Sequence, residues 1–324
     1  MTYAKPIKQT KPNTQLLWDM MQTMRPAGSK TETAFVKKYL DSIKGMKADS
    51  YGNRYIRIGT APVAWSCHTD TVHRTDGKQR IIYNKNKGII ALSSSEKTAT
   101  CLGADDTAGV WLMLEMIRSR KEGLYLFHRA EEIGGLGSDY IAKNTPELLD
   151  GIRAVIALDR KGTDSIITHQ IGGRCASEAF AQSLASQLVG YKADCTGSFT
   201  DSANYMAIVP ECSNLSVGYA NAHTASETLD YFHLLGLRES LLALDYSGLV
   251  YDRTPAAVDY DDYAEDYWSP ARSYRGSWVK SFDQERDCNS VRDFVESYPD
   301  AVADLLEQYG ITLEELYQSA PWLN

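Results

Sequence analysis

Apolar segments with the length of strands alternate with amphipathic helical segments over most of this chain. Strands that are apolar on both faces lie inside sheets covered on both sides, and their alternation with helices is typical of parallel sheets. The chain is therefore expected to have an α/β fold, a three-layer α/β/α sandwich around a largely parallel mixed sheet. The expected strands are 61–68, 123–130, 152–159 and 214–220, and the helices between them include 105–120, 137–144 and 177–188.

Other elements are expected to flank this alternating core. Helical spacing of apolar residues predicts two opening helices and one long helix near the end of the core, at 13–24, 30–45 and 229–250. A hairpin is expected at 79–93, and a short helix at 200–209.

The pattern changes after about residue 252, so three parts are expected. Residues 1–252 form the main domain. Residues 253–289 are rich in Tyr, Asp and Ser with little periodicity, which favours a linker or a surface segment. Residues 290–324 are predicted to form a short helical C-terminal extension, too short to bury much apolar surface alone.

Composition excludes several classes of protein. With 43% hydrophobic and 23% charged residues in 324, the chain has the balance of a globular protein. A net charge of −8 disfavours nucleic-acid binding, which needs a concentrated basic surface. The first fifteen residues are polar and lysine-bearing, so neither a signal peptide nor a membrane anchor is expected and the protein is predicted to be cytoplasmic. Six cysteines without CxxC spacing indicate reduced thiols.

Histidines and carboxylates follow the ends of the predicted strands. His68 ends one strand, and Asp70 lies two positions further with its side chain on the same side. This spacing lets a carboxylate bond one imidazole nitrogen and orient the other toward a metal ion. Asp159 ends another strand, and His223 follows the strand expected at 214–220.

Ligands of α/β proteins gather where parallel strands end, so these side chains are expected to meet. Asp105 belongs to the set because it lies at a junction between strand and helix, whereas Asp106 beside it is expected to cap that helix. Two histidines and three or four carboxylates are enough for two adjacent zinc sites that share one bridging carboxylate.

Two adjacent glutamates, Glu131 and Glu132, follow the strand expected at 123–130. Neighbouring side chains leave a strand toward opposite faces. Both could be ordinary solvated acids. Alternatively, one can ligate metal while the other accepts a proton from the metal-activated water.

The motifs HTDTV, LGADDTAG, AEEIGGLGS, LDRKG and AHTASE, with GSFTDSANY and VPECSNLSVGY, resemble the co-catalytic di-zinc exopeptidase superfamily. That superfamily contains zinc aminopeptidases, a tripeptidase and carboxypeptidase branch, and amide deacylases. The resemblance covers about residues 12–250 and implies that residues 1–252 are a zinc exopeptidase catalytic domain. The stretch from Asp159 to His223 is too short for an inserted lid domain, and that from His68 to Asp105 is too short for an inserted barrel. The resemblance is therefore to the compact single-domain zinc aminopeptidases.

The resemblance implies two zinc ions per chain, which cobalt or manganese could replace. His68 and Asp159 would hold one ion, and Glu132 and His223 the other. Asp105 would bridge both ions, Asp70 would orient His68, and Glu131 would be the general base.

Residues outside the metal set are predicted with alternatives. Asp201, in GSFTDSANY, is expected either to orient a substrate amino group or to cap a short helix. Arg174, on a glycine loop, could grip a substrate carboxylate. His73 could line the site or flank it on a loop. His128 is expected to lie in the core or directly behind the ligands rather than to be a ligand, and Cys67 is expected to pack in the core.

The leading functional hypothesis is an aminopeptidase that acts on peptides. An amide deacylase or a carboxypeptidase is the alternative within the same superfamily, acting on N-substituted amino acids or on peptides, because fold and metal site do not decide which side of the scissile bond is recognised. A third hypothesis is a non-catalytic metal-binding scaffold. The oligomeric state is left open.

Overall fold

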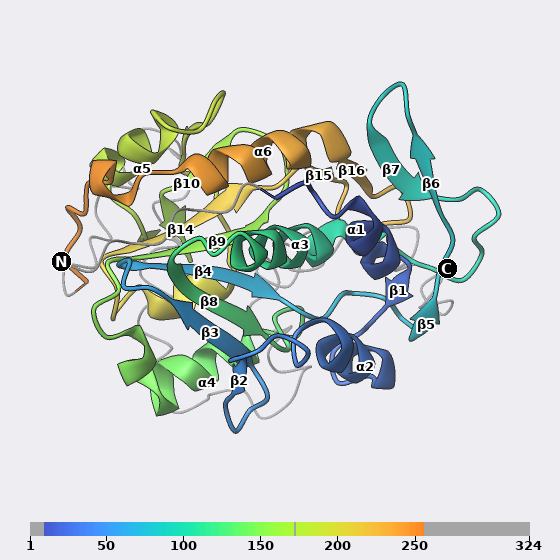
Figure 1. The fold of residues 1–324 in the computed structure, drawn as a ribbon, viewed down its shortest axis with the longest axis horizontal. Coiled ribbons are helices and arrows are strands. Elements are labelled where there is room, and N and C mark those ends of the chain that lie inside the picture. Colours follow the sequence, from blue (N-terminus) through green and yellow to red (C-terminus); the bar gives the residue numbers. More distant parts are fainter. Residues whose placement is uncertain (1–9, 172, 256–324) are drawn as a thin grey trace, which may run out of the picture. The chain divides into compact units, whose positions relative to one another are not determined.

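The centre of the molecule is a mixed sheet, drawn in Figure 1. The computed structural model describes residues 10–171 and 173–255. Within them, the sheet has eight strands in the order β13 (Lys192–Asp194), β10 (Ser165–Ile167), β14 (Glu211–Ser216), β9 (Ala154–Arg160), β4 (Val63–His68), β8 (Gly123–His128), β3 (Arg54–Ile58) and β2 (Lys47–Ala48). The central strands β14, β9, β4 and β8 are mutually parallel, while β10, β3 and β2 each run antiparallel to a neighbour nearer the centre.

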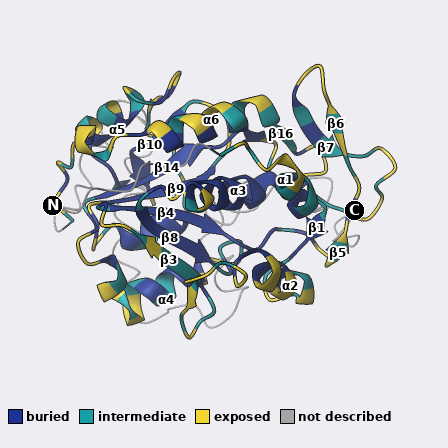
Figure 2. Cartoon of the chain, in the orientation of Figure 1, coloured by how far each residue is buried: buried dark blue, intermediate teal, exposed yellow. Residues whose placement is uncertain are grey.

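Helices cover both faces of this sheet, which confirms the expected α/β/α sandwich. On one face α3 (Ala104–Arg118) packs on β4 and β9, next to α1 (Thr14–Met21) and α6 (Tyr231–Ala243). The other face carries the 3-10 helix η2 (Asp201–Tyr205), against which α4 (Leu136–Asn144) packs. Figure 2 shows α3 and the central strands as the most buried elements.

Adjacent residues of β4 show the two faces directly. The Trp65 indole lies 3.3 Å from the hydroxyl of Tyr246, in the short 3-10 helix η3 (Tyr246–Gly248) that follows α6. The next residue, Ser66, bonds His128, whose other ring nitrogen lies 2.7 Å from the hydroxyl of Tyr205 in η2. Side chains alternate along a strand, so these two contacts belong to opposite layers.

A close approach brings α3 to the carboxyl end of β9. A Cβ atom on Gly109 would lie 2.3 Å from the carbonyl oxygen of Leu158. No larger residue fits there, so glycine lets the first turn of α3 rest directly on β9. The preceding residues, Asp105 and Asp106, are thereby placed beside Asp159.

A smaller four-stranded sheet is formed in the described part of the chain from the predicted hairpin and a distant segment. The hairpin strands β6 (Ile81–Asn84) and β7 (Ile89–Leu92) are extended by β16 (Thr228–Asp230) and β15 (Tyr219–Ala220). The turn that carries His223 lies between β15 and β16, so this sheet fixes where that histidine approaches the main sheet.

Four short strands and three helices complete the described secondary structure around these sheets. Two pairs of two-residue strands form beside them, β1 (Thr23–Met24) with β5 (Gly77–Lys78) and β11 (His169–Gln170) with β12 (Gly173–Arg174). The remaining helices are α2 (Lys30–Tyr39), α5 (Glu178–Ala185) and the 3-10 helix η1 (Pro146–Leu149).

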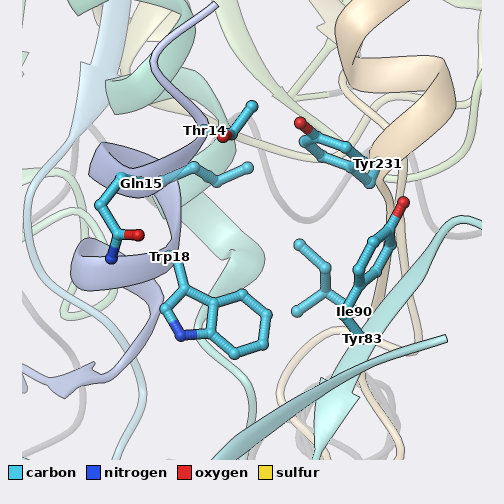
Figure 3. A pocket seen from close by; sticks show the side chains of 7 residues that line it. Thr14, Gln15, Trp18, Tyr83, Ile90 and Tyr231 are labelled. Carbon is cyan, nitrogen blue, oxygen red and sulfur yellow. The ribbon is translucent and has the colours of Figure 1, made fainter. Parts of the chain in front are cut away.

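A cavity of about 220 Å³ lies between α1, the β6–β7 hairpin and the start of α6 (Figure 3). The rings of Trp18, Tyr83 and Tyr231 line it together with Ile90. None of its lining residues belongs to the set predicted for the functional site.

Several element boundaries differ from the sequence predictions. The second opening helix ends at Tyr39, and the segment expected as one strand at 214–220 is divided between β14 and β15. Gly218, between them, has φ +100° and lies against α6, so the strand cannot continue through it. The short helix expected at 200–209 is η2 with a turn after it.

The long final helix is also shorter than predicted. It ends at Ala243 and is followed by η3, because the Asp245 carboxylate accepts bonds from the N–H and hydroxyl of Ser247 and starts a new turn.

Arg253, which lies beyond the predicted boundary at 252, packs into the main domain. The Arg253 guanidinium is buried and donates to the carbonyls of Arg174, Met206, Val209 and Pro210. The chain divides into two compact units, Met1–Tyr260 and Asp261–Asn324. The predicted C-terminal helical segment and most of the predicted linker lie outside the described residues.

Two expectations from composition can be compared with the described residues. No helix among them is long and apolar enough to cross a bilayer. The five described cysteines form no disulfide, and Cys67 is buried in the core as predicted.

Candidate active site

Five predicted ligand residues come together where the strands of the main sheet end. His68 ends β4, Asp159 lies near the end of β9, and Glu132 follows β8. Asp105 comes from the start of α3 and His223 from the turn between β15 and β16. Within the described residues they form two groups whose donor atoms all lie within 4.8 Å of one another: His68, Asp105 and Asp159, and Asp105, Glu132 and His223.

Asp105 belongs to both groups and presents one oxygen to each. Its Oδ1 lies 3.0 Å from Nε2 of His68, and its Oδ2 lies 3.2 Å from Nε2 of His223. The other carboxylates complete the groups, with Asp159 Oδ1 3.5 Å from His68 Nε2 and Glu132 Oε2 3.3 Å from His223 Nε2. Such an arrangement suits a carboxylate that bridges two cations.

The residues after β4 determine the orientation of His68. Its Nδ1 lies 3.1 Å from the main-chain oxygen of Asp70, so Nδ1 carries the proton and Nε2 is left to face the carboxylates. The Asp70 carboxylate is 3.5 Å from the same nitrogen and also accepts the main-chain N–H groups of Glu131 and Glu132, both at 3.2 Å. One buried aspartate therefore links the end of β4 to the glutamate pair after β8.

The glutamate pair is held in a tight turn. Ala130, just before it, has φ +61°, an uncommon conformation for a residue with a side chain. The N–H of Gly137 donates a hydrogen bond to the carbonyl of Arg129, and a Cβ on Gly137 would lie 2.4 Å from that oxygen. The glycine-rich sequence is therefore needed for the chain to fold back behind Glu131 and Glu132.

Glu131 belongs to neither group of ligand atoms and is only partly exposed. Burial raises the pKa of its carboxyl well above the usual range, and the nearby charges of Asp159 and Asp201 act in the same direction. A carboxylate with a raised pKa, close to the ligands but separate from them, has the properties of a proton acceptor.

The carboxylates of the two groups raise the pKa values of their neighbours. Burial and the charge of Asp105 raise the pKa of Glu132 to about 7 and that of Asp159 to about 6. Despite burial, hydrogen bonds to Asp105 and Glu132 raise the pKa of His223 to about 11.

One buried oxygen in these groups, Glu132 Oε1, has no hydrogen-bond partner. Buried carboxylates need a compensating charge, and within the described residues the ion pairs of Asp105, Glu132 and Asp159 are formed with histidines. The donor set fits divalent cations such as zinc.

Neutral residues hold Asp159 in place. The Thr200 hydroxyl lies 2.7 Å from Asp159 Oδ2, and the Tyr219 hydroxyl lies 3.3 Å from Oδ1. The Asn214 amide bonds both the N–H and the carbonyl of Asp159 across adjacent strands. Nothing in the sequence marked these three residues individually, although Thr200 lies inside the GSFTDSANY motif and Asn214 and Tyr219 lie inside VPECSNLSVGY.

Asp201 contacts the helix α4, which follows the glutamate turn. It is buried, accepts a bond of 2.6 Å from the Ser138 hydroxyl, and places Oδ2 3.1 Å from Nδ1 of His128. Thr200, not Asp201, is the N-cap of η2, so the predicted capping role is wrong. The predicted substrate role of Asp201 stays a prediction, and His128 is a buried core residue as expected.

The remaining predicted residues lie outside the two groups. Arg174 is half-buried in β12, and its predicted contact with a substrate carboxylate stays a prediction. His73 is buried and bonds Thr71, Gln79 and the carbonyl of Cys101, with its pKa lowered to about 4 by burial. Asp106 accepts the N–H of Gly109 at 2.8 Å, a bond of the kind expected from a capping carboxylate, although the N-cap residue of α3 is Gly103.

Comparisons with known proteins show the family and the fold of this chain. The model of Peptidase family M28 matches residues 50–215. No curated protein matches the sequence.

Solved structures share the fold at low sequence identity. The aminopeptidase PepT from Bacillus cereus has a TM-score of 0.58 and 14% identity over 72% of this chain and 97% of its own. A tripeptidase from Staphylococcus aureus has a TM-score of 0.58 and 16% identity over 70% of this chain and 95% of its own. The TET1 peptidase from Pyrococcus horikoshii has a TM-score of 0.52 and 15% identity over 71% and 98%. Below 25% identity such likeness shows the fold alone.

Proposed function

Because the chain belongs to peptidase family M28, we propose that it is a two-metal aminopeptidase that removes the N-terminal residue of peptides. One observation carries the proposal: the two oxygens of Asp105 face two different histidines, each with a further carboxylate beside it. A bridging carboxylate between two His–carboxylate groups is the donor set of a two-zinc hydrolase.

The five ligand residues would bind two metal ions. His68 and Asp159 would hold one zinc ion, Glu132 and His223 the other, and Asp105 both. When bound, the ions would polarise the substrate carbonyl and lower the pKa of the attacking water.

Glu131 would carry out the proton transfers. Its carboxylate would accept the proton of the attacking water and deliver it to the nitrogen of the leaving amine, since it lies beside the ligand groups without belonging to them. Asp70 would keep His68 oriented through Nδ1 and would fix the main chain of both glutamates.

The alternatives differ in which end of the substrate is recognised. A carboxypeptidase requires a free substrate carboxylate, whereas an amide deacylase accepts a blocked amino group. The short stretch between Asp159 and His223, which has no room for a lid domain, favours the aminopeptidase. A non-catalytic scaffold would bind metal and cleave none of these substrates.

The test uses one short peptide in three forms: free at both ends, acetylated at its amino end, and amidated at its carboxyl end. We expect release of the first amino acid from the free and amidated peptides but not from the acetylated one, because the substrate's amino group is the expected recognition element. Activity should disappear with a chelator and return with zinc. Faster cleavage of the acetylated peptide would indicate a deacylase, and a requirement for the free carboxylate would indicate a carboxypeptidase.

A further inference from the structure

Glu227, four residues after His223, is a buried carboxylate that binds main-chain N–H groups of a distant segment. Its Oε2 accepts the N–H groups of Leu102 and Gly103, both at 2.9 Å, and its Oε1 accepts the N–H of Asp105 at 3.0 Å. Only 1% of the residue is exposed. Among the described residues, these main-chain groups are the hydrogen-bond partners of its side chain.

The three N–H groups belong to the segment that enters α3. Gly103, the N-cap residue, has a left-handed conformation and provides no side chain to bond the first N–H groups of the helix. Glu227 fills this role from a position 122 residues beyond Asp105. A carboxylate suits it, because the amino end of a helix attracts negative charge.

The same residue is tied to His223 through a short turn. The N–H of Glu227 donates to the carbonyl of Thr224, and His223 itself has φ +67°. One end of this turn carries a ligand of the second group, and the other end holds the main chain of Asp105. Glu227 therefore connects the main chain of Asp105 to the turn that carries His223, whose Nε2 lies 3.2 Å from Asp105 Oδ2.

We propose that Glu227 is a positioning residue that sets Asp105 against His223 for the second metal ion. This inference rests on the proposed two-metal function. A purely structural role would predict lost stability with unchanged metal binding. The two roles can be separated because the chain contains a matched residue elsewhere.

That matched residue is Glu211 at the start of β14. It is also fully buried and also accepts three main-chain N–H groups, those of Ser177 at 2.7 Å, Asp252 at 2.8 Å and Arg253 at 2.9 Å. It pairs with Ala154, at the opposite end of β9 from Asp159. Glu211→Gln therefore reproduces the loss of a buried carboxylate anchor without touching the metal groups.

The experiment titrates cobalt into the metal-free full-length protein and follows its visible absorption, with elemental analysis of the zinc-loaded forms. We expect Glu227→Gln to bind the first ion like the wild type and the second about 10- to 100-fold more weakly, the usual cost of losing a residue that supports a metal ligand. Glu211→Gln should bind both ions like the wild type, even where its unfolding midpoint falls. If Glu227→Gln does not fold by circular dichroism, Glu227→Asp, which keeps the charge but shortens the reach, takes its place with the same expectation.

Two results would overturn this inference and leave the proposed function standing. One is a folded Glu227 variant that binds the second ion as tightly as the wild type, and the other is an equal loss of metal in Glu211→Gln. A wild-type protein that binds no second ion would end the proposed function, and this inference with it.

Discussion

Asp70 shows how much of the proposed chemistry depends on one residue. Its main-chain oxygen orients His68, and its two carboxylate oxygens each hold the N–H of one glutamate. A substitution there would disturb a ligand, a neighbouring ligand and the proposed base together. Asp70 is therefore a poor position for separating roles, whereas the two glutamates are good ones.

At Glu131 and Glu132, equal substitutions should have unequal effects. Glu131→Gln removes the proposed proton acceptor, which is outside the ligand groups, so both metal ions should remain while kcat falls about 100- to 10,000-fold. Glu132→Gln removes a ligand oxygen, so the second ion should be lost. Elemental analysis of both purified variants measures the difference. Equal metal loss in the two would contradict the assigned roles.

His73 should make stability depend on pH. Its pKa is about 4 in the folded protein, against an ordinary value of 6.5, because burial disfavours the charged ring. The unfolded chain therefore takes up a proton between these values while the folded protein does not. Stability from this group is complete above pH 6.5 and is lost as the pH falls toward 4, by about 2 kcal/mol at pH 5.

The check is urea unfolding of metal-free wild type and His73→Gln at pH 7 and pH 5. Between pH 7 and pH 5, the free energy of unfolding should fall more in the wild type than in the variant. An equal loss would show that other groups account for the whole pH dependence.

Among the elements, the contact between α3 and β9 has the clearest consequence for the site. Gly109→Ala would place a Cβ 2.3 Å from the Leu158 carbonyl oxygen. We expect a loss of about 1–3 kcal/mol in the free energy of unfolding, as for overpacked cores, and lower activity because Asp105 moves with the helix.

The control for this prediction is Gly236→Ala in α6, where a Cβ would meet nothing within 4 Å. That change should stabilise the protein by about 0.5–1 kcal/mol and leave activity unchanged. Urea unfolding and the peptide assay measure both variants. Unchanged stability in Gly109→Ala would mean that α3 can shift away from β9 without cost.

The elements that alternate in the sequence were predictable, because periodicity reports which faces are buried. The proximity of the five predicted ligand residues was also predictable, since each lies at the end of a strand, follows a strand or begins a helix. Their roles as metal ligands stay predictions. Strand boundaries near Gly218 were not, because the break depends on contact with α6. Glu227 was not singled out either: its partners lie more than a hundred positions away, and nothing local in AHTASE marks the last residue as an anchor.

At the scale of the whole molecule, the structure moves the useful truncation point. A domain boundary at 252 would remove Arg253, whose guanidinium donates to four main-chain carbonyls. We predict that a chain ending at Tyr260 binds metal and hydrolyses a chromogenic amino-acid amide like the full-length protein, whereas one ending at Asp252 has a lower unfolding midpoint. If the chain ending at Tyr260 folds by circular dichroism but has lost turnover, residues beyond 260 complete the active site.

The order of the proposed ligands along the chain also has a consequence for biosynthesis. His68, Asp105, Glu132 and Asp159 leave the ribosome well before His223, the last of the five. A nascent chain can therefore assemble the first group while the second still lacks its histidine. Domains form during synthesis as their segments emerge. The second metal ion would thus bind only after β15, β16 and the final helix have packed against the main sheet. A stalled or truncated product would therefore carry a single ion.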